Sequence, residues 1–212
     1  MTLPKLQVAL DNNTIPSAIK SIKALGDIVD IIEVGTILCL AEGSEAIKVM
    51  RALYPDKIIL VDTKCADAGK TVAQNCRDAG ANWMTVICSA SIETMIAANN
   101  VVEELQVELY GDWTFEQAAL WYQSNIKQVV YHQSRDALLS GKSWDDSDLE
   151  KIKRLIEMGF RVSVTGGLDV NTIKLFKGLD VEAFIAGRSL RDAEDPKQAA
   201  IEFKQEIQRV FS

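Results

Sequence analysis

Ile58-Ile59-Leu60-Val61-Asp62 is a run of four apolar residues that ends in an acid, and the fold prediction rests on this pattern. A short, continuous apolar run with β-branched residues is typical of a strand that is buried on both faces of a parallel sheet. Amphipathic stretches lie on either side of it, and the combination returns along the whole chain. The sequence therefore predicts repeated βα units.

Eight such runs are present, and we expect each to be a strand. They cover residues 6–11, 31–35, 58–64, 83–88, 106–109, 128–132, 161–165 and 183–187. Between them the apolar residues recur every three or four positions, as helices require. Examples are Ala46, Val49, Met50 and Leu53; Leu149, Ile152, Leu155 and Ile156; and Ala200, Phe203, Ile207 and Val210.

The number and spacing of these units predict a single-domain (β/α)8 barrel, the TIM barrel, over residues 1–212. Eight units in this length leave about 26 residues each, enough for compact units with short loops. The alternative is an open, doubly wound sheet, which usually has a glycine-rich fingerprint after its first strand. Here Asn12, Asn13 and Thr14 follow Asp11 instead, and no linker or low-complexity tract divides the chain.

Three helix starts can be read from capping residues. Thr114 with Gln117, and Ser147 with Glu150, have the spacing of a capping box, in which each residue satisfies a free backbone donor. Asp195 stands before Pro196, as an acidic cap before a proline in the first turn.

Composition excludes several classes of protein. The chain has 23 basic and 30 acidic side chains, a net charge of −7, which argues against binding along a nucleic-acid backbone. No apolar run approaches the roughly 20 residues that a membrane helix needs, and the first residues lack the pattern of a signal peptide. We therefore expect a cytoplasmic protein. Its four cysteines lack C-x-x-C spacing and are expected to be free, buried thiols.

Polar side chains stand at the end of the apolar runs. Because all strands of a parallel barrel end at the same mouth, we expect these side chains to meet there. They are Asp11, Glu33, Asp62, Glu108, His132 and Thr165.

Four acids at one mouth repel one another unless cations lie among them. Lys64 is one candidate, since it lies two residues beyond Asp62 and so on the same side of the strand. A divalent ion held by Glu33 and Asp62 is the second. With one histidine in the chain, such an ion has to be bound by carboxylates, which favours a hard ion such as Mg²⁺.

The last two predicted strands end in glycines. Thr165 is followed by Gly166 and Gly167, and Gly187 is followed by Arg188. Glycine lets a ligand approach backbone amides closely, and the loops after strands seven and eight are the usual phosphate site of this fold. The guanidinium of Arg188 adds a fork of donors. We therefore expect a phosphorylated ligand.

The run Asp62-Thr63-Lys64-Cys65-Ala66-Asp67 gives the third strand a D-x-K-x-x-D motif, and with it the sequence resembles the orotidine 5′-monophosphate decarboxylase suprafamily. Within that suprafamily it is most similar to the 3-keto-L-gulonate 6-phosphate decarboxylases, essentially from end to end. The segments that carry the resemblance are residues 6–11, 31–36, 131–136, 164–167 and 185–189.

The resemblance implies a magnesium-dependent carboxy-lyase of L-ascorbate catabolism, which converts 3-keto-L-gulonate 6-phosphate into L-xylulose 5-phosphate and carbon dioxide. It implies that Glu33 and Asp62 bind the metal and that Lys64 and His132 act on the intermediate. It also implies a homodimer in which Asp67 reaches into the partner's site.

The residues agree with this chemistry. Loss of carbon dioxide from a β-keto acid leaves an enediolate, which a metal ion and the ammonium of Lys64 can stabilise. His132 is the residue type best suited to moving a proton near neutral pH, and Arg135 can hold polar substrate groups or a water.

Three alternatives remain. A D-arabino-hexulose 6-phosphate synthase forms a similar enediolate but joins it to formaldehyde. The decarboxylases that this sequence resembles have the residue types of Glu108, Arg135 and Thr165 at these positions, whereas the synthases generally do not, so these residues favour the decarboxylase. A phosphosugar 3-epimerase usually needs several histidines around zinc, and this chain has one. A non-catalytic phosphosugar-binding barrel needs only the glycine loops, and would not need Asp11 or the acids around Lys64.

Overall fold

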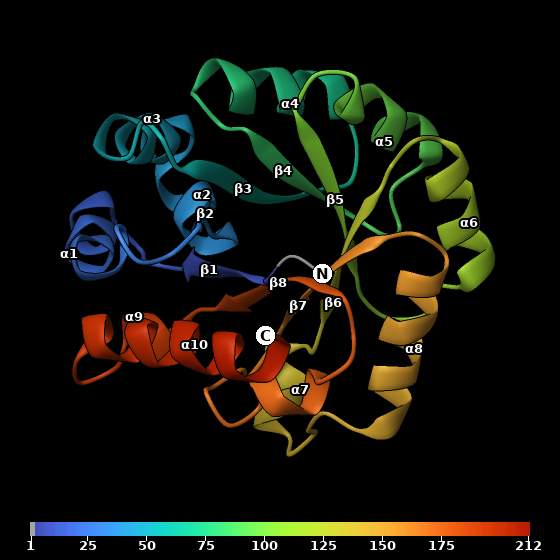
Figure 1. The fold of residues 1–212 in the computed structure, drawn as a ribbon. Coiled ribbons are helices and arrows are strands. Elements are labelled where there is room, and N and C mark those ends of the chain that lie inside the picture. Colours follow the sequence, from blue (N-terminus) through green and yellow to red (C-terminus); the bar gives the residue numbers. More distant parts are fainter. Residues whose placement is uncertain (1–2) are drawn as a thin grey trace.

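The protein is a closed barrel of parallel strands, which confirms the predicted fold class (Figure 1). The computed structural model describes residues 3–212, apart from the side chain of Arg135. Within that range eight strands follow one another around the barrel, and β8 pairs with β1 to close it. They are β1 (Lys5–Leu10), β2 (Ile31–Val34), β3 (Ile58–Cys65), β4 (Trp83–Ile87), β5 (Glu104–Leu109), β6 (Gln128–His132), β7 (Arg161–Thr165) and β8 (Val181–Ala186).

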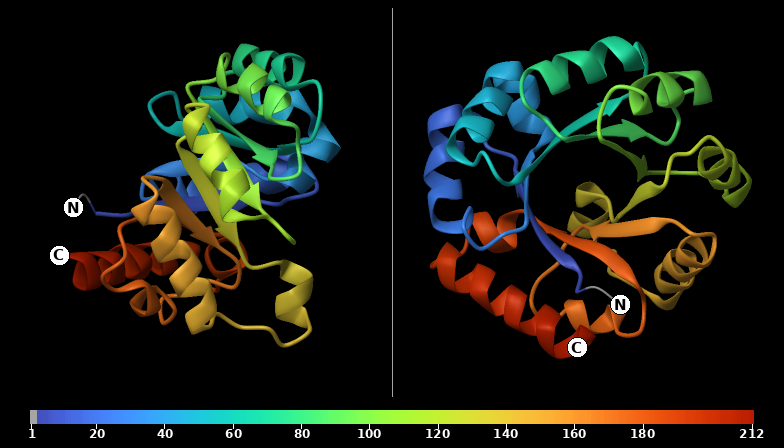
Figure 2. Two further views of the ribbon diagram at one scale, coloured as in Figure 1. Left: turned by 90° about the vertical axis from the view of Figure 1, so that its right-hand side faces the viewer. Right: turned by 45° about the horizontal axis from the view of Figure 1, so that its top comes forward.

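Helices surround the ring of strands on the outside (Figure 2). The longer ones are α1 (Ile15–Leu25), α3 (Ser44–Leu53), α4 (Gly69–Asp78), α5 (Ile92–Asn99), α6 (Phe115–Gln123), α8 (Asp146–Glu157) and α10 (Pro196–Phe211). Shorter ones are α2 (Thr36–Glu42), α7 (Arg135–Leu139), the 3-10 helix η1 (Ile173–Phe176) and α9 (Arg188–Arg191). Among the described residues, no helix combines the length and the apolar character needed to cross a bilayer.

The strand boundaries differ from the predicted ones at several ends. Asp11 lies just beyond β1, while β5 and β8 begin two residues before the apolar runs from which we predicted them. The reason is that backbone pairing, not composition, sets the ends. Glu104 already pairs with Trp83, and Val181 already pairs with Val162.

Two of the three predicted helix starts are confirmed. Thr114 and Gln117 form the capping box of α6, and Asp195 caps α10 before its proline. The prediction for Ser147 is wrong, because α8 begins earlier. Asp145 is its cap, and it forms the box with Asp148. The carboxylate of Asp145 accepts bonds from two backbone N–H groups, leaving Ser147 inside the first turn.

The apolar faces of the helices pack against the barrel. Buried positions on α8 and α10 agree with the predicted stripes, namely Ile152, Leu155, Ala200, Phe203 and Ile207. On α3 the stripe is shifted. Ile47 is buried with Ala46 and Met50, whereas Leu53 is 45% exposed because the helix ends there and its side chain turns to the surface.

The four cysteines are free thiols, as predicted from their spacing. Cys65, Cys76 and Cys88 are buried, and Cys39 is half-buried. Burial raises the pKa of Cys76 to about 12, so this thiol stays protonated near neutral pH.

An apolar layer fills the inside of the barrel and positions the polar residues above it. Side chains alternate along a strand, so residues two apart face the same side. Ile31 on β2 and Leu60 on β3 belong to the interior cluster, with Trp83 and Ala183. Glu33 and Asp62 follow two residues later, and so face the barrel interior one layer closer to the mouth.

Candidate active site

The polar residues at the strand ends surround one cavity at the carboxyl ends of the strands. Its volume is about 580 Å³. The structure brings together all six residues that the strand-end pattern selected, which are Asp11, Glu33, Asp62, Glu108, His132 and Thr165. They come from six different strands or strand ends, so only the closed barrel makes them neighbours.

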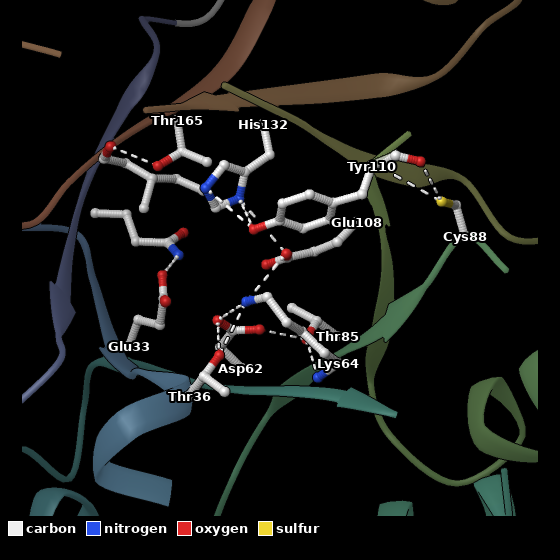
Figure 3. A network of polar contacts seen from close by, with 12 residues as sticks. Glu33, Thr36, Asp62, Lys64, Thr85, Cys88, Glu108, Tyr110, His132 and Thr165 are labelled. Atoms are coloured by element: carbon white, nitrogen blue, oxygen red, sulfur yellow. Dashed lines mark hydrogen bonds and ion pairs between the residues drawn. The ribbon is translucent and has the colours of Figure 1, made fainter. Parts of the chain in front are cut away.

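Lys64 provides a positive charge in the lining of this cavity, between Asp62 and Glu108 (Figure 3). Its Nζ contacts the carboxylate of Asp62, lies 3.1 Å from Oε2 of Glu108, and donates a 2.9 Å hydrogen bond to Oγ1 of Thr36. Burial alone lowers the pKa of Lys64, but the charges of Glu108 and Asp62 outweigh it and hold the pKa well above its usual range. The side chain is therefore a fixed ammonium.

The backbone at Lys64 is unusual, because its φ is +44° and the pairing of β3 with β4 is irregular between Val61 and Cys65. Residues other than glycine rarely adopt this backbone conformation, and such strain is concentrated at functional sites. The backbone N–H of Lys64 donates to Oγ1 of Thr85, which helps to hold the distorted turn. The lysine thus reaches the cavity through a bulge rather than by simple alternation along the strand.

Asp62 is held as an anion by three donors. Oγ1 of Thr36 lies 2.5 Å from one carboxylate oxygen, Oγ1 of Thr85 lies 2.8 Å from the other, and Lys64 supplies the charge. Burial raises the pKa of Asp62, but Lys64 and the hydroxyl groups outweigh burial and lower it below its usual value. Thr36 and Thr85 were not selected from the sequence.

The pKa of Glu33 is shifted in the opposite direction to that of Asp62. It is buried, and its one hydrogen-bond donor within the described residues is Nε2 of Gln7, at 2.5 Å. Burial raises its pKa well above the usual value, and the charges of Asp62, Asp11 and Glu108 raise it further. Ionisation of Glu33 is therefore disfavoured here, and a cation beside it would relieve the repulsion.

The donor set fits a magnesium ion. Glu33 and Asp62 stand on neighbouring strands, and both offer hard oxygen ligands. Among the described residues no group of three or more histidine, cysteine or acidic side chains is placed to bind a metal. A site on Glu33 and Asp62 would leave the other coordination positions of the ion to water and substrate. Mg²⁺ commonly binds in that way, whereas zinc does not.

On the other side of Lys64, Glu108 and His132 form a second polar pair. Nδ1 of His132 lies 3.5 Å from Oε2 of Glu108. Burial raises the pKa of Glu108 and Asp62 raises it further, while His132 and Lys64 oppose the shift. The hydroxyl of Tyr110 lies 2.7 Å from Nδ1 of His132, and Tyr110 also lines the cavity. Sequence reasoning missed Tyr110, since it follows the polar strand end by two residues.

Glycines border the cavity beside β7 and β8. Gly166, Gly167, Gly187 and Arg188 all line it, as does Thr165. Only glycine fits at position 166, because its φ is +108° and a Cβ would lie 2.3 Å from the carbonyl oxygen of Gln133. Glycine is therefore required at this position by the close packing of Gly166 against Gln133.

Arg191 is a further cation that the sequence did not single out. It lines the same cavity, and its guanidinium pairs with Asp192. Its Nη1 is buried and has no hydrogen-bond partner within residues 3–212. With Arg188 it gives this side of the cavity two guanidinium groups.

Two predicted site residues are not placed in the cavity. Asp67 is exposed, does not line the cavity of its own chain, and accepts a 2.7 Å hydrogen bond from the N–H of Ala68. The side chain of Arg135 lies outside the described part of the structure, although its backbone begins α7 at the edge of the site.

A barrel whose mouth combines buried acids, a fixed ammonium and a glycine-lined side belongs to the TIM-barrel enzymes that act on small anionic substrates. The chain is a member of the Orotidine 5'-phosphate decarboxylase / HUMPS family, whose model matches residues 4–203.

Individual relatives agree with this assignment. The 3-keto-L-gulonate-6-phosphate decarboxylase (KGPDC) of Salmonella paratyphi B is 52% identical over the whole of both chains. A crystal structure of KGPDC from Streptococcus mutans is 56% identical, covers both chains completely and superposes with a TM-score of 0.98. The 3-hexulose-6-phosphate synthase of Salmonella typhimurium is more distant. It is 28% identical, with a TM-score of 0.89, over 97% of this chain and 99% of the other.

Proposed function

We propose that the protein catalyses the magnesium-dependent decarboxylation of 3-keto-L-gulonate 6-phosphate to L-xylulose 5-phosphate and carbon dioxide, as a cytoplasmic enzyme of L-ascorbate catabolism. The observation that carries the proposal is the position of Lys64, an ammonium held between Asp62 and Glu108 in the cavity. The likeness to 3-keto-L-gulonate-6-phosphate decarboxylases supports the choice of substrate.

In this proposal the glycine side of the cavity holds the substrate phosphate. The amides of Gly166, Gly167 and Gly187 and the guanidinium of Arg188 supply the donors, so the sugar chain extends toward the acids and Lys64. Asp11 and Thr165 are close enough to the same cavity to bind hydroxyl groups of the sugar.

Glu33 and Asp62 would hold Mg²⁺, which when bound supplies a Lewis acid for the oxygens of the β-keto acid. Lys64 stabilises the negative charge that develops as carbon dioxide departs, because its ammonium is already desolvated and fixed. The proton that then quenches the enediolate comes from the side of Glu108, His132 and Arg135. His132 is the group that holds and delivers it.

The test is direct. Purified protein with Mg²⁺ and 3-keto-L-gulonate 6-phosphate is expected to release one equivalent of carbon dioxide, measured by a coupled assay. A chelator should suppress the release, and added Mg²⁺ should restore it. The dephosphorylated substrate should turn over far more slowly, because it lacks the group that the glycine side binds. No release from the phosphorylated substrate in the presence of Mg²⁺ would refute the proposal.

The same protein should also be assayed for the synthase reaction, and the two rates compared. D-ribulose 5-phosphate and formaldehyde would give a hexulose phosphate through a similar enediolate. We expect this activity to be a minor one. A synthase rate above the decarboxylase rate would assign the site to the other branch of the family.

We also propose a homodimer with shared sites, in which Asp67 acts in the partner's cavity. Its exposure, and its position outside the cavity of its own chain, support this. Lys64→Ala and Asp67→Ala are each expected to be inactive. After subunit exchange their mixture should recover up to about a quarter of wild-type activity, since mixed dimers have one complete site. Mixed dimers that form and stay inactive would rule out sharing.

A further inference from the structure

The indole of Trp144 contacts the glycine side of the cavity from outside the cavity. Trp144 stands in the loop between α7 and α8, and its Nε1–H donates a 2.9 Å hydrogen bond to the carbonyl oxygen of Gly166. An indole nitrogen can only donate, so the direction of this bond is fixed. Gly166 and Gly167 line the cavity, whereas Trp144 does not. The carbonyl group of Gly166 therefore points toward the indole and away from the cavity.

The direction of this carbonyl group determines the direction of the next N–H group. The peptide between Gly166 and Gly167 is trans and planar, so its C=O and N–H bonds point in opposite directions. Because the carbonyl is directed at Trp144, the N–H of Gly167 is directed toward the cavity. Within residues 3–212 this N–H donates to no protein acceptor. It is therefore free to donate to an anion in the cavity.

Two consecutive glycines would otherwise leave this peptide free to turn. Gly166 has a φ of +108° and Gly167 a φ of +64°, both in the region that favours glycine. Since neither residue has a Cβ, the peptide between them can rotate at little steric cost. In the turned form its carbonyl oxygen would face the cavity and repel a phosphate. The hydrogen bond from Trp144 stabilises the form that binds an anion.

The indole is held in turn by its neighbours. The ring of Trp144 meets the ring of Phe176 edge to face, with 5.0 Å between centroids, and lies 6.0 Å from the ring of Tyr131. The next residue, Asp145, is the N-cap of α8 and fixes where the chain enters that helix. Its partner in the capping box, Asp148, also accepts a 2.7 Å hydrogen bond from the hydroxyl of Tyr131. Contacts from β6, α8 and η1 thus hold the indole nitrogen against the glycine carbonyl.

We propose that Trp144 is a positioning residue, whose indole holds the peptide between Gly166 and Gly167 in the orientation that presents the N–H of Gly167 to the phosphate of the ligand. This role rests on the proposed function, in which the glycine side of the cavity binds that phosphate. Trp144 acts on the ligand through Gly166, at the side of the cavity away from Lys64. It should therefore affect binding much more than the chemical step.

The sequence allows this one peptide to be observed alone. Gly166 and Gly167 are the only consecutive glycines among the 12 of the chain. The protein is made by cell-free synthesis with glycine that carries ¹³C in its carboxyl group and ¹⁵N in its amine. An NMR experiment that correlates each amide with the preceding carbonyl then gives one signal, that of this peptide.

Two responses of this signal are expected. Inorganic phosphate should shift the amide proton of Gly167 in the wild type. Trp144→Phe keeps an aromatic ring but removes the N–H donor, so it should shift the carbonyl carbon of Gly166. Trp113→Phe is the matched control, because Trp113 also packs against Tyr131 but does not contact the glycines through a hydrogen bond. It should leave the carbonyl signal unchanged.

Binding and turnover provide the second measurement. Trp144→Phe should weaken the binding of inorganic phosphate about tenfold, as titrated on the same amide signal, which is the size expected for losing one orienting hydrogen bond. KM for the phosphorylated substrate should rise by a similar factor, while kcat changes less than about twofold. A residue that only supports the fold would instead lower the active fraction, and so kcat, without raising KM.

A wild-type amide signal that does not respond to saturating phosphate would overturn the inference, and this test needs no variant to fold. A Trp144→Phe protein with an unchanged carbonyl signal and an unchanged KM would also overturn it. Both outcomes are separable from failure of the proposed function. A protein that releases no carbon dioxide but binds phosphate in a way that depends on Trp144 would refute the reaction and support the role of Trp144.

Discussion

Lys64→Ala is expected to lower kcat for decarboxylation about a thousandfold or more. In the proposed reaction the variant loses the ammonium that stabilises the developing enediolate, and preorganised charges of this kind account for large parts of enzymatic rate enhancement. We propose that the phosphate end binds at the glycine side of the cavity, away from Lys64, so KM should change much less. Initial rates of carbon dioxide release at saturating substrate measure the effect.

The same substitution affects stability, and the controls must separate the two effects. Without Lys64 the buried carboxylates of Asp62 and Glu108 lose their cation, so the melting temperature should fall while the barrel remains intact by circular dichroism. Lys151→Ala, at an exposed position on α8, is the matched control and should retain full activity. A Lys64→Ala enzyme that keeps more than a tenth of the wild-type kcat would contradict the proposed role.

Glu33→Gln is expected to reduce activity by about a hundredfold or more and to remove the response to Mg²⁺. It takes away one of the two carboxylates that we assign to the metal, while its size and its contact with Gln7 are kept. Mg²⁺ should raise the melting temperature of the wild type but not that of the variant, because a ligand stabilises only the state that binds it.

In chelator the variant should melt higher than the wild type. The pKa of Glu33 is raised in the folded state, so the folded protein binds its proton more tightly than the unfolded chain does. Its contribution to stability therefore falls as pH rises from the unfolded pKa toward the folded one, so above the unfolded pKa the titratable carboxyl group is destabilising relative to the amide of Glu33→Gln. Glu194→Gln, at an exposed loop position, should change neither property. An unchanged Mg²⁺ response in Glu33→Gln would place the metal elsewhere.

The sequence predicted the barrel and much of its mouth because one regularity governs both. Apolar runs such as residues 58–62 are long enough to be buried strands, and the polar residue at the end of six of them, an acid in four, marks the end facing the mouth. Asp62 and Glu33 could be assigned to one cavity on this ground alone, since parallel strands in a closed barrel end together.

Residues that serve the site from other positions could not be found in this way. Gln7 and Thr85 stand inside strands, and only the closed barrel shows that they face Glu33 and Asp62. A polar residue within a buried parallel strand is the signal that would have indicated them. Tyr110 gives no such signal, because its contact with His132 depends on how two strand ends approach each other.

Helix boundaries were missed where two residues offered similar capping chemistry. Ser147 has the spacing of a cap, but Asp145 stands two residues earlier and accepts hydrogen bonds from two backbone N–H groups of the first turn. The choice between them depends on where the chain leaves the preceding loop, which local spacing does not specify.

The most direct test of the central claim is a crystal structure of the protein with Mg²⁺ and a phosphorylated sugar acid bound. We predict the ion on Glu33 and Asp62, the ammonium of Lys64 within hydrogen-bonding distance of ligand oxygens, and the phosphate against the glycine side of the cavity. A ligand bound with its phosphate elsewhere, and with no metal on Glu33 or Asp62, would contradict the account.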